Sequence, residues 1–366
     1  MVYVSGMRHL RVPSTETAQW RERLMLAGWL AGGVGIQSDG DHRLLPLNDL
    51  APSDADAGFE GHTIVQRPSL ERGPQHWRER LPPSLLTTLE PFLPAAHEVQ
   101  GDVLLVKLEP EVEAHATAIA EAMLAQFSHV RVVCVDGGVT GPFRIRDLRV
   151  LAARGDDAST ETTVREHGLD YTLDPATAYF SARLSREREA AMALIKAHQA
   201  HLGRRLVAHD PYAGVGPNLG LPLQAGAIEV AVVGDLNGQA IPYLRSNLSR
   251  IIAKSAHSEA SLVVREGDGR EWQHDSDLQR RADLLFVNLP HEGLDHLTDL
   301  IPLLANDALV LGWAVVDRHQ EEIVVARVRA VFEAAGRQVD VDVRATKGFS
   351  TTRTMVRLVV RATTGS

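Results

Sequence analysis

The sequence predicts an α/β protein in which an open, doubly wound sheet forms the C-terminal part and two smaller α+β domains precede it. Two observations carry this prediction. From about residue 190 onward, apolar runs of strand length alternate with segments of helical length, which is the pattern of a parallel sheet. The first of these runs ends in the glycine-rich stretch "HDPYAGVGPNLG", and ligands of such sheets bind at the carboxyl ends of the strands.

The bulk composition is that of an ordinary globular protein of 366 residues, long enough for two or three domains. No apolar stretch approaches the roughly 20 residues of a membrane helix, and the first residues show no signal-peptide pattern. The single cysteine, Cys134, excludes an intramolecular disulfide and fits a reducing compartment, so we expect a cytoplasmic protein. The net charge of −9 argues mildly against a nucleic-acid partner. Arginines are nevertheless concentrated locally, in residues 143–154, 182–188 and 344–361.

The first domain is expected over residues 1–60. Its segment "RHLRVPSTETAQWRERLMLAGWL" predicts a strand and then a helix from about Thr15 to Gly28, capped by Ser14 or Thr15. "HRLLPLND" predicts a second short strand. Residues 51–75 are rich in Pro, Asp, Ala and Gly, and they predict a linker.

The middle α+β domain is expected over residues 61–165. "HEVQGDVLLVKLEP" has strand character, "EVEAHATAIAEAMLAQF" has helical periodicity, and "HVRVVCVD" predicts a buried strand. The remaining domain, residues 166–366, contains five predicted parallel strands: "RLVAHDPYA", "EVAVVGDLN", "SLVVREGDG", "DLLFVNLP" and "ALVLGWAVV". Two further β-rich segments, "QVDVDVRA" and "TMVRLVVRA", predict an antiparallel pair at the sheet edge.

The glycine-rich stretch after the first of these strands contains Gly214 and Gly216, which permit a tight turn and a close approach of a ligand to the backbone. It is not the dinucleotide fingerprint, since the third glycine, Gly220, comes one residue late, and no Gly-Lys-Ser/Thr follows as in a P-loop. Taken alone, the two glycines indicate a ligand site and a purely structural turn about equally.

Acidic residues at three successive strand ends favour the ligand site. Asp210 ends the first strand. Asp235 ends the second strand, about 20 residues beyond the glycines, where its carboxylate would accept hydrogen bonds from ribose hydroxyls. Asp268 follows the third strand, where it would meet an adenine amino group or, alternatively, serve only as a turn residue. Together the three acids and the glycines favour S-adenosylmethionine over NAD.

The fourth strand ends in "NLP", with Asn288 two residues before Pro290. This arrangement is typical of enzymes that methylate nitrogen atoms, although a simple strand-ending turn would also explain it. The following "HEGLDH" (291–296) is one residue too long for a His-Glu-x-x-His zinc motif, because residues i and i+5 do not share a helix face.

These stretches together resemble the archaeal and eukaryotic tRNA (guanosine-37, N1)-methyltransferase family, over nearly the whole chain. "DPYAGVGP" is similar to the family's "D-x-F-A-G-V-G-P", "YFSARLSRER" to "Y-F-S-P-R-L-x-x-E-R", and "GPFRIRDLRVLA" to "G-x-F-R-x-R-E-x-x-x-L-A". The "NLP" segment matches the family's strand-four motif, and the first domain resembles the family's tRNA-docking domain. The resemblance implies that the C-terminal domain is a Rossmann-like class I methyltransferase sheet.

The resemblance also implies residue roles. Arg144 matches the arginine that faces the guanine carbonyl oxygen, Glu187 the general base, and Asn288 the residue that positions the base edge. A surface ion-pair cluster of Arg144, Glu187 and nearby arginines is the alternative explanation. The implied cofactor shell consists of Tyr179, Asp210, Tyr212, Gly214, Gly216, Asp235, Asp268, Asn288 and Pro290. No metal is implied.

The function implied is methyl transfer from S-adenosyl-L-methionine to N1 of guanosine 37 of tRNA, next to the anticodon, by a monomer without membrane contact or an obligate protein partner. The sequence departs from the family at Ala182 and Gly238, where the family has proline, and in "GFSTTR" (348–353), where it has Ser-Tyr-Ala-Pro. The alternatives are methylation of a wyosine-type tricyclic guanosine, aminocarboxypropyl transfer at the same position, and a small-molecule or cofactor-modifying enzyme that has lost RNA binding. A non-catalytic RNA-binding protein with a retained cofactor pocket is a fourth.

Overall fold

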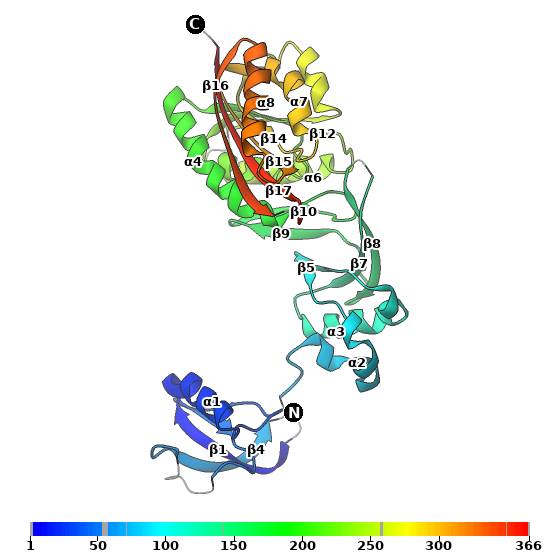
Figure 1. Ribbon diagram of the computed structural model, residues 1–366, viewed down its shortest axis with the longest axis vertical. Coiled ribbons are helices and arrows are strands. Elements are labelled where there is room, and N and C mark those ends of the chain that lie inside the picture. Colours follow the sequence, from blue (N-terminus) through cyan, green and yellow to red (C-terminus); the bar gives the residue numbers. More distant parts are fainter. Residues whose placement is uncertain are drawn as a thin grey trace. The chain divides into compact units, whose positions relative to one another are not determined.

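The computed structural model describes residues 3–52, 58–70, 72–141, 143–256, 259–348 and 350–364, without the side chains of residues 3–5 and 347–348 (Figure 1). The chain divides into two compact units, one that ends at Glu90 and one that begins at Pro91. Each unit is described by itself. None of the described helices is long and apolar enough to cross a membrane.

The first unit contains a four-stranded antiparallel sheet of order β2-β3-β1-β4, covered by α1 (Thr17–Leu26). Its strands are β1 (Tyr3–Pro13), β2 (Gln37–Asp39), β3 (His42–Pro46) and β4 (Thr63–Leu70). Trp20 and Leu24 of α1 are buried against the sheet. After the sheet come η2 (Trp77–Arg80), α2 (Pro83–Leu89) and η3 (Glu90–Phe92).

Two expectations for this unit were wrong. Neither Ser14 nor Thr15 caps the helix: residues 14–16 form a 3-10 turn (η1), α1 follows Glu16, and the Ser14 hydroxyl donates to the carbonyl of Asp41 at 2.8 Å. The segment expected to be a linker contains β4, which pairs with β1, so the sheet extends past residue 60. β4 lies at the sheet edge, where the missing N–H of Pro68 does not disrupt pairing on its outer side.

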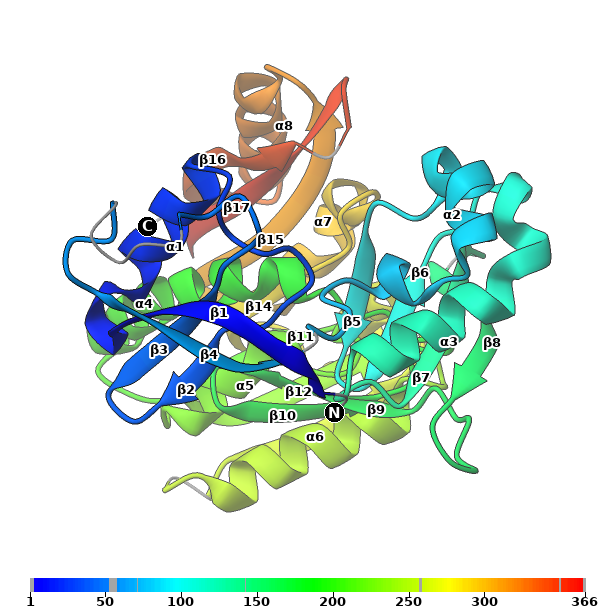
Figure 2. The same ribbon diagram turned by 90° about the horizontal axis from the view of Figure 1, so that it is seen from below.

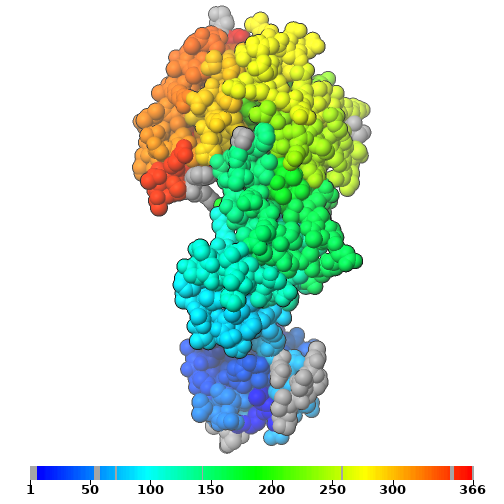
Figure 3. Space-filling model, turned by 90° about the vertical axis from the view of Figure 1, so that its right-hand side faces the viewer, coloured from blue at the N-terminus to red at the C-terminus, as the bar shows by residue number. Residues whose placement is uncertain are grey.

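The second unit begins with a four-stranded sheet of order β5-β6-β7-β8, against which α3 (Ala116–Gln126) packs. Its strands are β5 (His97–Gln100), β6 (Val103–Val106), β7 (Val132–Thr140) and β8 (Ile145–Ala153), and η4 (Pro110–His115) leads into α3. Cys134 is buried in this core, as expected, and burial raises the pKa of its thiol to about 11. In the space-filling view, the green surface of this region runs without a break into the C-terminal part of the same unit (Figure 3).

A hairpin of β9 (Thr162–Glu166) and β10 (Leu169–Leu173) follows and lies along α6 (Ile241–Lys254), as Figure 2 shows. The Asn247 side chain of α6 accepts the N–H of Thr172 and donates to its carbonyl, each at 2.9 Å. The hairpin therefore joins the helical layer of the domain that follows.

The C-terminal domain is a seven-stranded sheet of order β13-β12-β11-β14-β15-β17-β16, which confirms the predicted doubly wound fold. Its strands are β11 (Leu206–Asp210), β12 (Ile228–Asp235), β13 (Ser261–Glu266), β14 (Ala282–Val287), β15 (Leu304–Asp317), β16 (Arg337–Gly348) and β17 (Arg353–Thr364). The first five are parallel, and β17 inserts antiparallel between β15 and β16. All residues of β14 are buried, as in a strand covered on both faces.

Helices cover both faces of this sheet. One face packs against α4 (Ser185–Leu202), α5 (Pro217–Gln224) and α6, and the other against α7 (Gly293–Leu300) and α8 (Glu321–Ala334) (Figure 1). The short turns η5 (Ala182–Leu184), η6 (Gly269–His274) and η7 (Ile301–Leu303) complete the domain. Strand carboxyl ends therefore meet at one edge, which is where the candidate site lies.

A buried ion pair fixes the start of α4. The Nε and Nη2 atoms of Arg188 donate to Glu166 at 2.7 and 2.5 Å, and Nη2 also donates to the carbonyl of Ser181 at 2.9 Å. The two charged side chains are only 3% and 6% exposed. Their hydrogen bonds tie the first turn of α4 to the β9–β10 hairpin.

We expect Arg188→Met to lower the free energy of unfolding by about 3–5 kcal/mol, because it leaves the Glu166 charge buried and unpaired. Thermal and urea unfolding of the full chain would measure this. The matched control is Arg327→Met, which breaks an exposed pair with Asp295 and should cost below about 1 kcal/mol. Equal effects of the two substitutions would contradict the assignment of the Arg188 pair as buried and structural.

Candidate active site

Asp210 lies at the base of the site, at the end of β11, and it is fully buried. Its carboxylate accepts the N–H of Tyr212 at 3.3 Å and the side-chain amide of Asn218 at 3.1 Å. Burial raises the pKa of Asp210 to about 7. These contacts brace the turn between β11 and α5, so Asp210 supports the ligand loop from below.

The turn itself requires glycine at two positions. Gly214 and Gly216 have φ angles of 55° and 92°, in the left-handed region that other residues avoid. A Cβ atom on Gly216 would also lie 2.8 Å from Cδ2 of Leu248 on α6. At Gly214, by contrast, a Cβ atom would meet only the carbonyl of Tyr179, at 3.6 Å. Helix packing therefore accounts for Gly216, while Gly214 leaves its backbone accessible to a ligand.

Asp235, the last residue of β12, is the acid that connects two loops of the site. Its carboxylate accepts the N–H of Gly214 at 2.8 Å and the N–H of Asn237 at 2.9 Å, and burial raises its pKa. An ionised carboxylate accepts more than two hydrogen bonds, so capacity remains for ribose hydroxyls. Asn237, which the sequence analysis did not single out, donates in turn to the carbonyl of Thr177 at 2.7 Å and so holds the segment that carries Tyr179.

Tyr179 and Tyr212 provide the aromatic part of the site. The side chain of Tyr179 is 47% exposed and available to a ligand. The hydroxyl of Tyr212 lies 2.8 Å from Nδ1 of His296 on α7, and burial is the main cause that raises the pKa of this tyrosine. His296 belongs to residues 291–296, the segment whose spacing excludes a His-Glu-x-x-His zinc motif. Nothing in the sequence indicated its contact with Tyr212.

The Asp268 carboxylate, which was expected to bind the adenine amino group, is already bound within the protein. Its carboxylate caps η6 by accepting the N–H of Arg270 at 2.9 Å, and it forms an ion pair with the Arg270 guanidinium at 2.5 Å. The hydrogen bond to the Arg270 side chain is the main cause that lowers the pKa of Asp268. An adenine amino group would therefore share this carboxylate with Arg270, and the turn role proposed as the alternative is present in the structure.

The register of β14, β15 and β17 places the expected catalytic residue Asn288 at the edge of the sheet where the strand carboxyl ends meet. Val287 of β14 is the register partner of Gly312 on β15, so Asn288 follows at the level of Trp313, and Trp313 pairs with Arg357 on β17. Pro290 is anchored there as well, because its carbonyl accepts the N–H of Val315 at 2.7 Å.

Glu187, in the first turn of α4, reaches this level of the sheet. Its Oε2 atom lies 3.6 Å from Nη1 of Arg357. Three polar atoms here are buried without a hydrogen-bond partner among the described residues: Glu187 Oε2, Arg357 Nε and Trp313 Nε1. Buried polar atoms without hydrogen-bond partners are rare in native structures, and a bound water, ion or ligand is one way in which such atoms are satisfied.

Arg144 occupies the turn between β7 and β8 with a φ angle of 54°, unusual for a residue with a side chain. Burial, and after it the charges of Arg144 and Arg353, lower the pKa of His291. Arg144 is therefore close enough to act electrostatically on the loop that follows Asn288. Pro142, part of the same motif, lies outside the described residues.

The arginines that follow Arg144 form ion pairs, as the alternative expects, although the Arg146 pair is largely buried, whereas the Arg149 pair is exposed. Arg146 pairs with Asp136 at 2.6 Å and with Glu98 at 2.8 Å, and Arg149 pairs with Glu113. Arg144 itself forms no ion pair with a described residue. Of these arginines, Arg144 is thus the one whose charge remains available to a substrate.

The departures from the expected motifs have local explanations. A Cβ atom on Gly238 would lie 2.6 Å from Oε1 of Glu266, so a side chain there would displace that glutamate. Ala182 begins η5 at an exposed position. Within "GFSTTR", Phe349 lies outside the described residues, and Ser350 accepts the N–H of Arg353 at 3.0 Å in the turn between β16 and β17.

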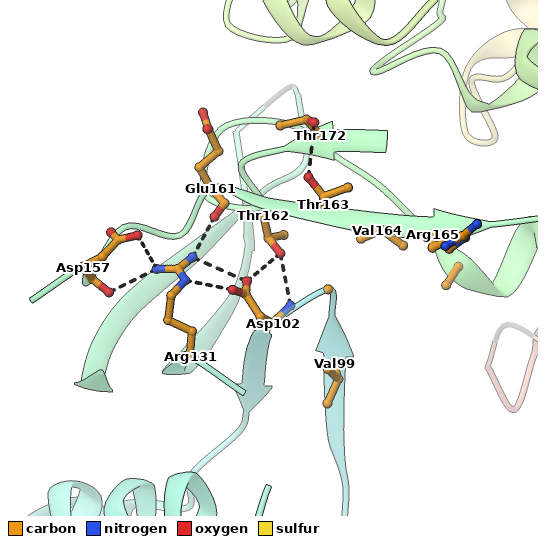
Figure 4. A pocket seen from close by; sticks show the side chains of 12 residues that line it. Val99, Asp102, Arg131, Asp157, Glu161, Thr162, Thr163, Val164, Arg165 and Thr172 are labelled. Atoms are coloured by element: carbon orange, nitrogen blue, oxygen red, sulfur yellow. Dashed lines mark hydrogen bonds and ion pairs between the residues drawn. The ribbon is translucent and has the colours of Figure 1, made fainter. Parts of the chain in front are cut away.

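A separate hollow of about 830 Å³ lies between the middle sheet and the β9–β10 hairpin (Figure 4). Its prominent cation, Arg131, donates to Asp102 at 2.8 Å, to the carbonyl of Ser159 at 2.9 Å and to that of Glu161 at 2.8 Å. Since its donors are already used, Arg131 clamps the chain segment before β9. The hollow shares no lining residue with the candidate active site. Among the described residues, no group of three His, Cys, Asp or Glu side chains is placed to hold a metal ion.

The strand order, with its antiparallel insertion of β17, and the acids at the strand ends define a class I S-adenosylmethionine-dependent methyltransferase domain. The residues present fit the cofactor: the Asp235 carboxylate can accept hydrogen bonds from the ribose hydroxyls, the Tyr179 ring is exposed, and Gly214 has no side chain to exclude the ligand. Residues 162–344 match the TRM5/TYW2 methyltransferase domain, and residues 77–158 match the TYW2 N-terminal domain. The chain belongs to the TRM5/TYW2 methyltransferase family.

Known proteins agree with this assignment. The chain is 29% identical over 298 residues to the tRNA (guanine(37)-N(1))-methyltransferase Trm5b of Pyrococcus abyssi, a match that covers 80% of each protein. The crystal structure of that organism's Trm5b superimposes with a TM-score of 0.67 at 25% identity, covering 98% of this chain and 99% of that one. A complex of aTrm5 with tRNALeu has a TM-score of 0.69 at 20% identity, covering 96% and 99%. Several relatives with the same enzyme name are longer, and the matches span 31% to 52% of their length.

Proposed function

We propose that this protein transfers the methyl group of S-adenosyl-L-methionine to N1 of guanosine 37 in tRNA. The observation that carries the proposal is the Glu187 carboxylate, whose Oε2 atom is buried without a hydrogen bond to a described residue, at the same sheet edge as Asn288. The names of the curated relatives, which are tRNA (guanine(37)-N(1))-methyltransferases, support the substrate and the position.

The chemistry follows from these groups. The cofactor supplies an electrophilic methyl group on sulfur, and N1 of guanine carries a proton that must leave as the new nitrogen–carbon bond forms. Glu187 accepts that proton. Negative charge then moves to the guanine carbonyl oxygen, where the guanidinium of Arg144, which forms no ion pair with a described residue, stabilises it. Asn288 holds the base edge, so that N1 attacks the methyl carbon in line with the breaking carbon–sulfur bond.

Aminocarboxypropyl transfer at the same nucleotide is the second candidate function, because residues 77–158 match the TYW2 N-terminal domain. The Asn288-Leu289-Pro290 segment argues against it, since it matches the strand-four motif of the methyl-transferring branch. The small-molecule alternative rests on the altered residues 348–353 and the net charge of −9.

Two tRNA transcripts that differ only in guanosine or adenosine at position 37 test the proposal. With methyl-labelled S-adenosylmethionine, we expect label in the guanosine transcript alone. Label in both transcripts would place the methylated nucleotide elsewhere. Label in neither, with the cofactor still bound, would favour a small-molecule substrate.

We expect that removing residues 1–72, the whole β1–β4 sheet, raises the KM for tRNA by about 10²-fold or more, since a linked second binding module multiplies affinity. Cofactor affinity should stay unchanged, because the residues that fit the cofactor lie in the second unit. The cut follows β4, since a cut at residue 60 would separate β1 from its partner strand. Unchanged tRNA turnover in the truncated protein would contradict a docking role for this domain.

We further propose that the enzyme works as a monomer in the cytoplasm. Exposed arginines such as Arg183 and Arg186, next to Glu187, would contact tRNA phosphates, which makes binding salt-sensitive. Sedimentation of the free protein and of its tRNA complex tests the oligomeric state.

A further inference from the structure

The only described carboxylate in contact with Arg357 is that of Glu187. Nη1 of Arg357 lies 3.6 Å from Oε2 of Glu187, and the two side chains are 21% and 24% exposed. This separation is too long for a hydrogen bond, yet it is short for two opposite charges in a poorly solvated place. The two side chains thus interact by charge, at a carboxylate oxygen that is itself buried.

The strand register shows why Arg357 meets α4. Leu311 and Val359 belong to the core that also contains Ala191 and Ile195 of α4. Side chains two positions apart on a strand share a face, so Trp313 and Arg357 also face α4, directly opposite each other. The buried atoms Trp313 Nε1, Arg357 Nε and Glu187 Oε2, which have no hydrogen-bond partner among the described residues, therefore lie between α4 and the face of the sheet that it covers.

The other arginines near this face of the sheet contact groups that have no expected catalytic role. Arg361, four residues along β17, pairs with Asp340 at 3.2 Å, and Arg344, the β16 partner of Arg357, pairs with Asp342 at 3.0 Å. Arg353 donates to the carbonyl of Val315 at 3.2 Å. Arg357 thus differs from them in its contact with a candidate catalytic group.

We propose that Arg357 is a positioning residue for the methyl transfer: its guanidinium attracts the buried Oε2 atom of Glu187 and so holds the carboxylate in place, while the other carboxylate oxygen receives the N1 proton. The inference rests on the function proposed above. A buried carboxylate oxygen without hydrogen bonds is costly, and the nearby positive charge offsets part of that cost.

The variants Arg357→Met and Arg357→Lys, with Arg361→Met as the matched control on the same strand and face, test the inference. Single-turnover methyl transfer to the guanosine-37 transcript is measured at saturating tRNA and cofactor, and the KM for tRNA separately. We expect Arg357→Met to lower the saturated rate by about 10²-fold with an unchanged KM, as a misplaced catalytic group does. Arg357→Lys should restore much of the rate, because it restores the charge, and Arg361→Met should behave as wild type.

An undiminished saturated rate in Arg357→Met would overturn the inference. A loss that Arg357→Lys does not rescue, with a matching fall in thermal stability and cofactor binding, would also overturn it, since it would show a structural role only. Failure of the proposed function is distinguishable, because the wild-type protein itself would then not label the guanosine-37 transcript.

Discussion

Glu187→Gln is expected to lower the single-turnover rate of methyl transfer to tRNA by about 10²–10⁴-fold, the usual contribution of a general base. Glutamine keeps the size of the side chain but cannot accept the N1 proton. Its amide would also remove the charge that faces Arg357 across 3.6 Å. The rate is measured with saturating methyl-labelled cofactor and a guanosine-37 transcript.

The control for this substitution is Glu189→Gln, an exposed position on the same helix, which should leave the rate unchanged. Binding of tRNA and of the cofactor should survive in both variants, as filter binding and calorimetry would show. A wild-type rate in Glu187→Gln would exclude Glu187 as the base. A protein that binds tRNA without transferring label in any variant would be an RNA-binding protein that has lost catalysis.

Asp235→Asn is expected to weaken S-adenosylmethionine binding by about ten- to a hundredfold. Hydrogen bonds to a charged group contribute about 1.5–3 kcal/mol, and each 1.4 kcal/mol is a factor of ten in affinity. The amide also replaces one acceptor by a donor, so either Gly214 or Asn237 loses its partner. Calorimetric titration with the cofactor measures the effect.

Asp268→Asn provides the comparison, because the Asp268 carboxylate already accepts hydrogen bonds from Arg270 and therefore has less capacity left for the cofactor. Its effect on cofactor affinity should be clearly smaller than that of Asp235→Asn. If the two variants lost affinity equally, or if Asp268→Asn lost more, Asp235 would not be the main acidic ligand.

The strands of the C-terminal domain were predictable because each is marked by an apolar run within its own short stretch of sequence. Each apolar run from "RLVAHDPYA" to "TMVRLVVRA" appears as a strand, and the expected antiparallel pair is β16 and β17. The first unit was harder. β4 was missed because Pro68 and the surrounding loop residues concealed it, and the Ser14 cap was wrong because the hydroxyl instead contacts Asp41, a residue distant in sequence.

The same distinction applies to the site. The glycine turn and the acids at the ends of β11 and β12 follow from a general rule about parallel sheets, so they were found from short motifs. His296 and Arg357 were not, since their partners Tyr212 and Glu187 lie far away in the chain and only the folded sheet brings them together. Trp313 gave no sequence signal because its unpartnered Nε1 becomes evident only when its burial is known.

The central claim is transfer of a methyl group, and not of the aminocarboxypropyl group, to guanosine 37. Its most direct test is product analysis after reaction of a guanosine-37 transcript with two batches of S-adenosylmethionine, labelled either in the methyl group or in the amino-acid carbon chain. The account predicts 1-methylguanosine that carries the methyl label and no label from the carbon chain. A nucleoside that carries the carbon-chain label would contradict it and assign the protein to the other transfer reaction of its family.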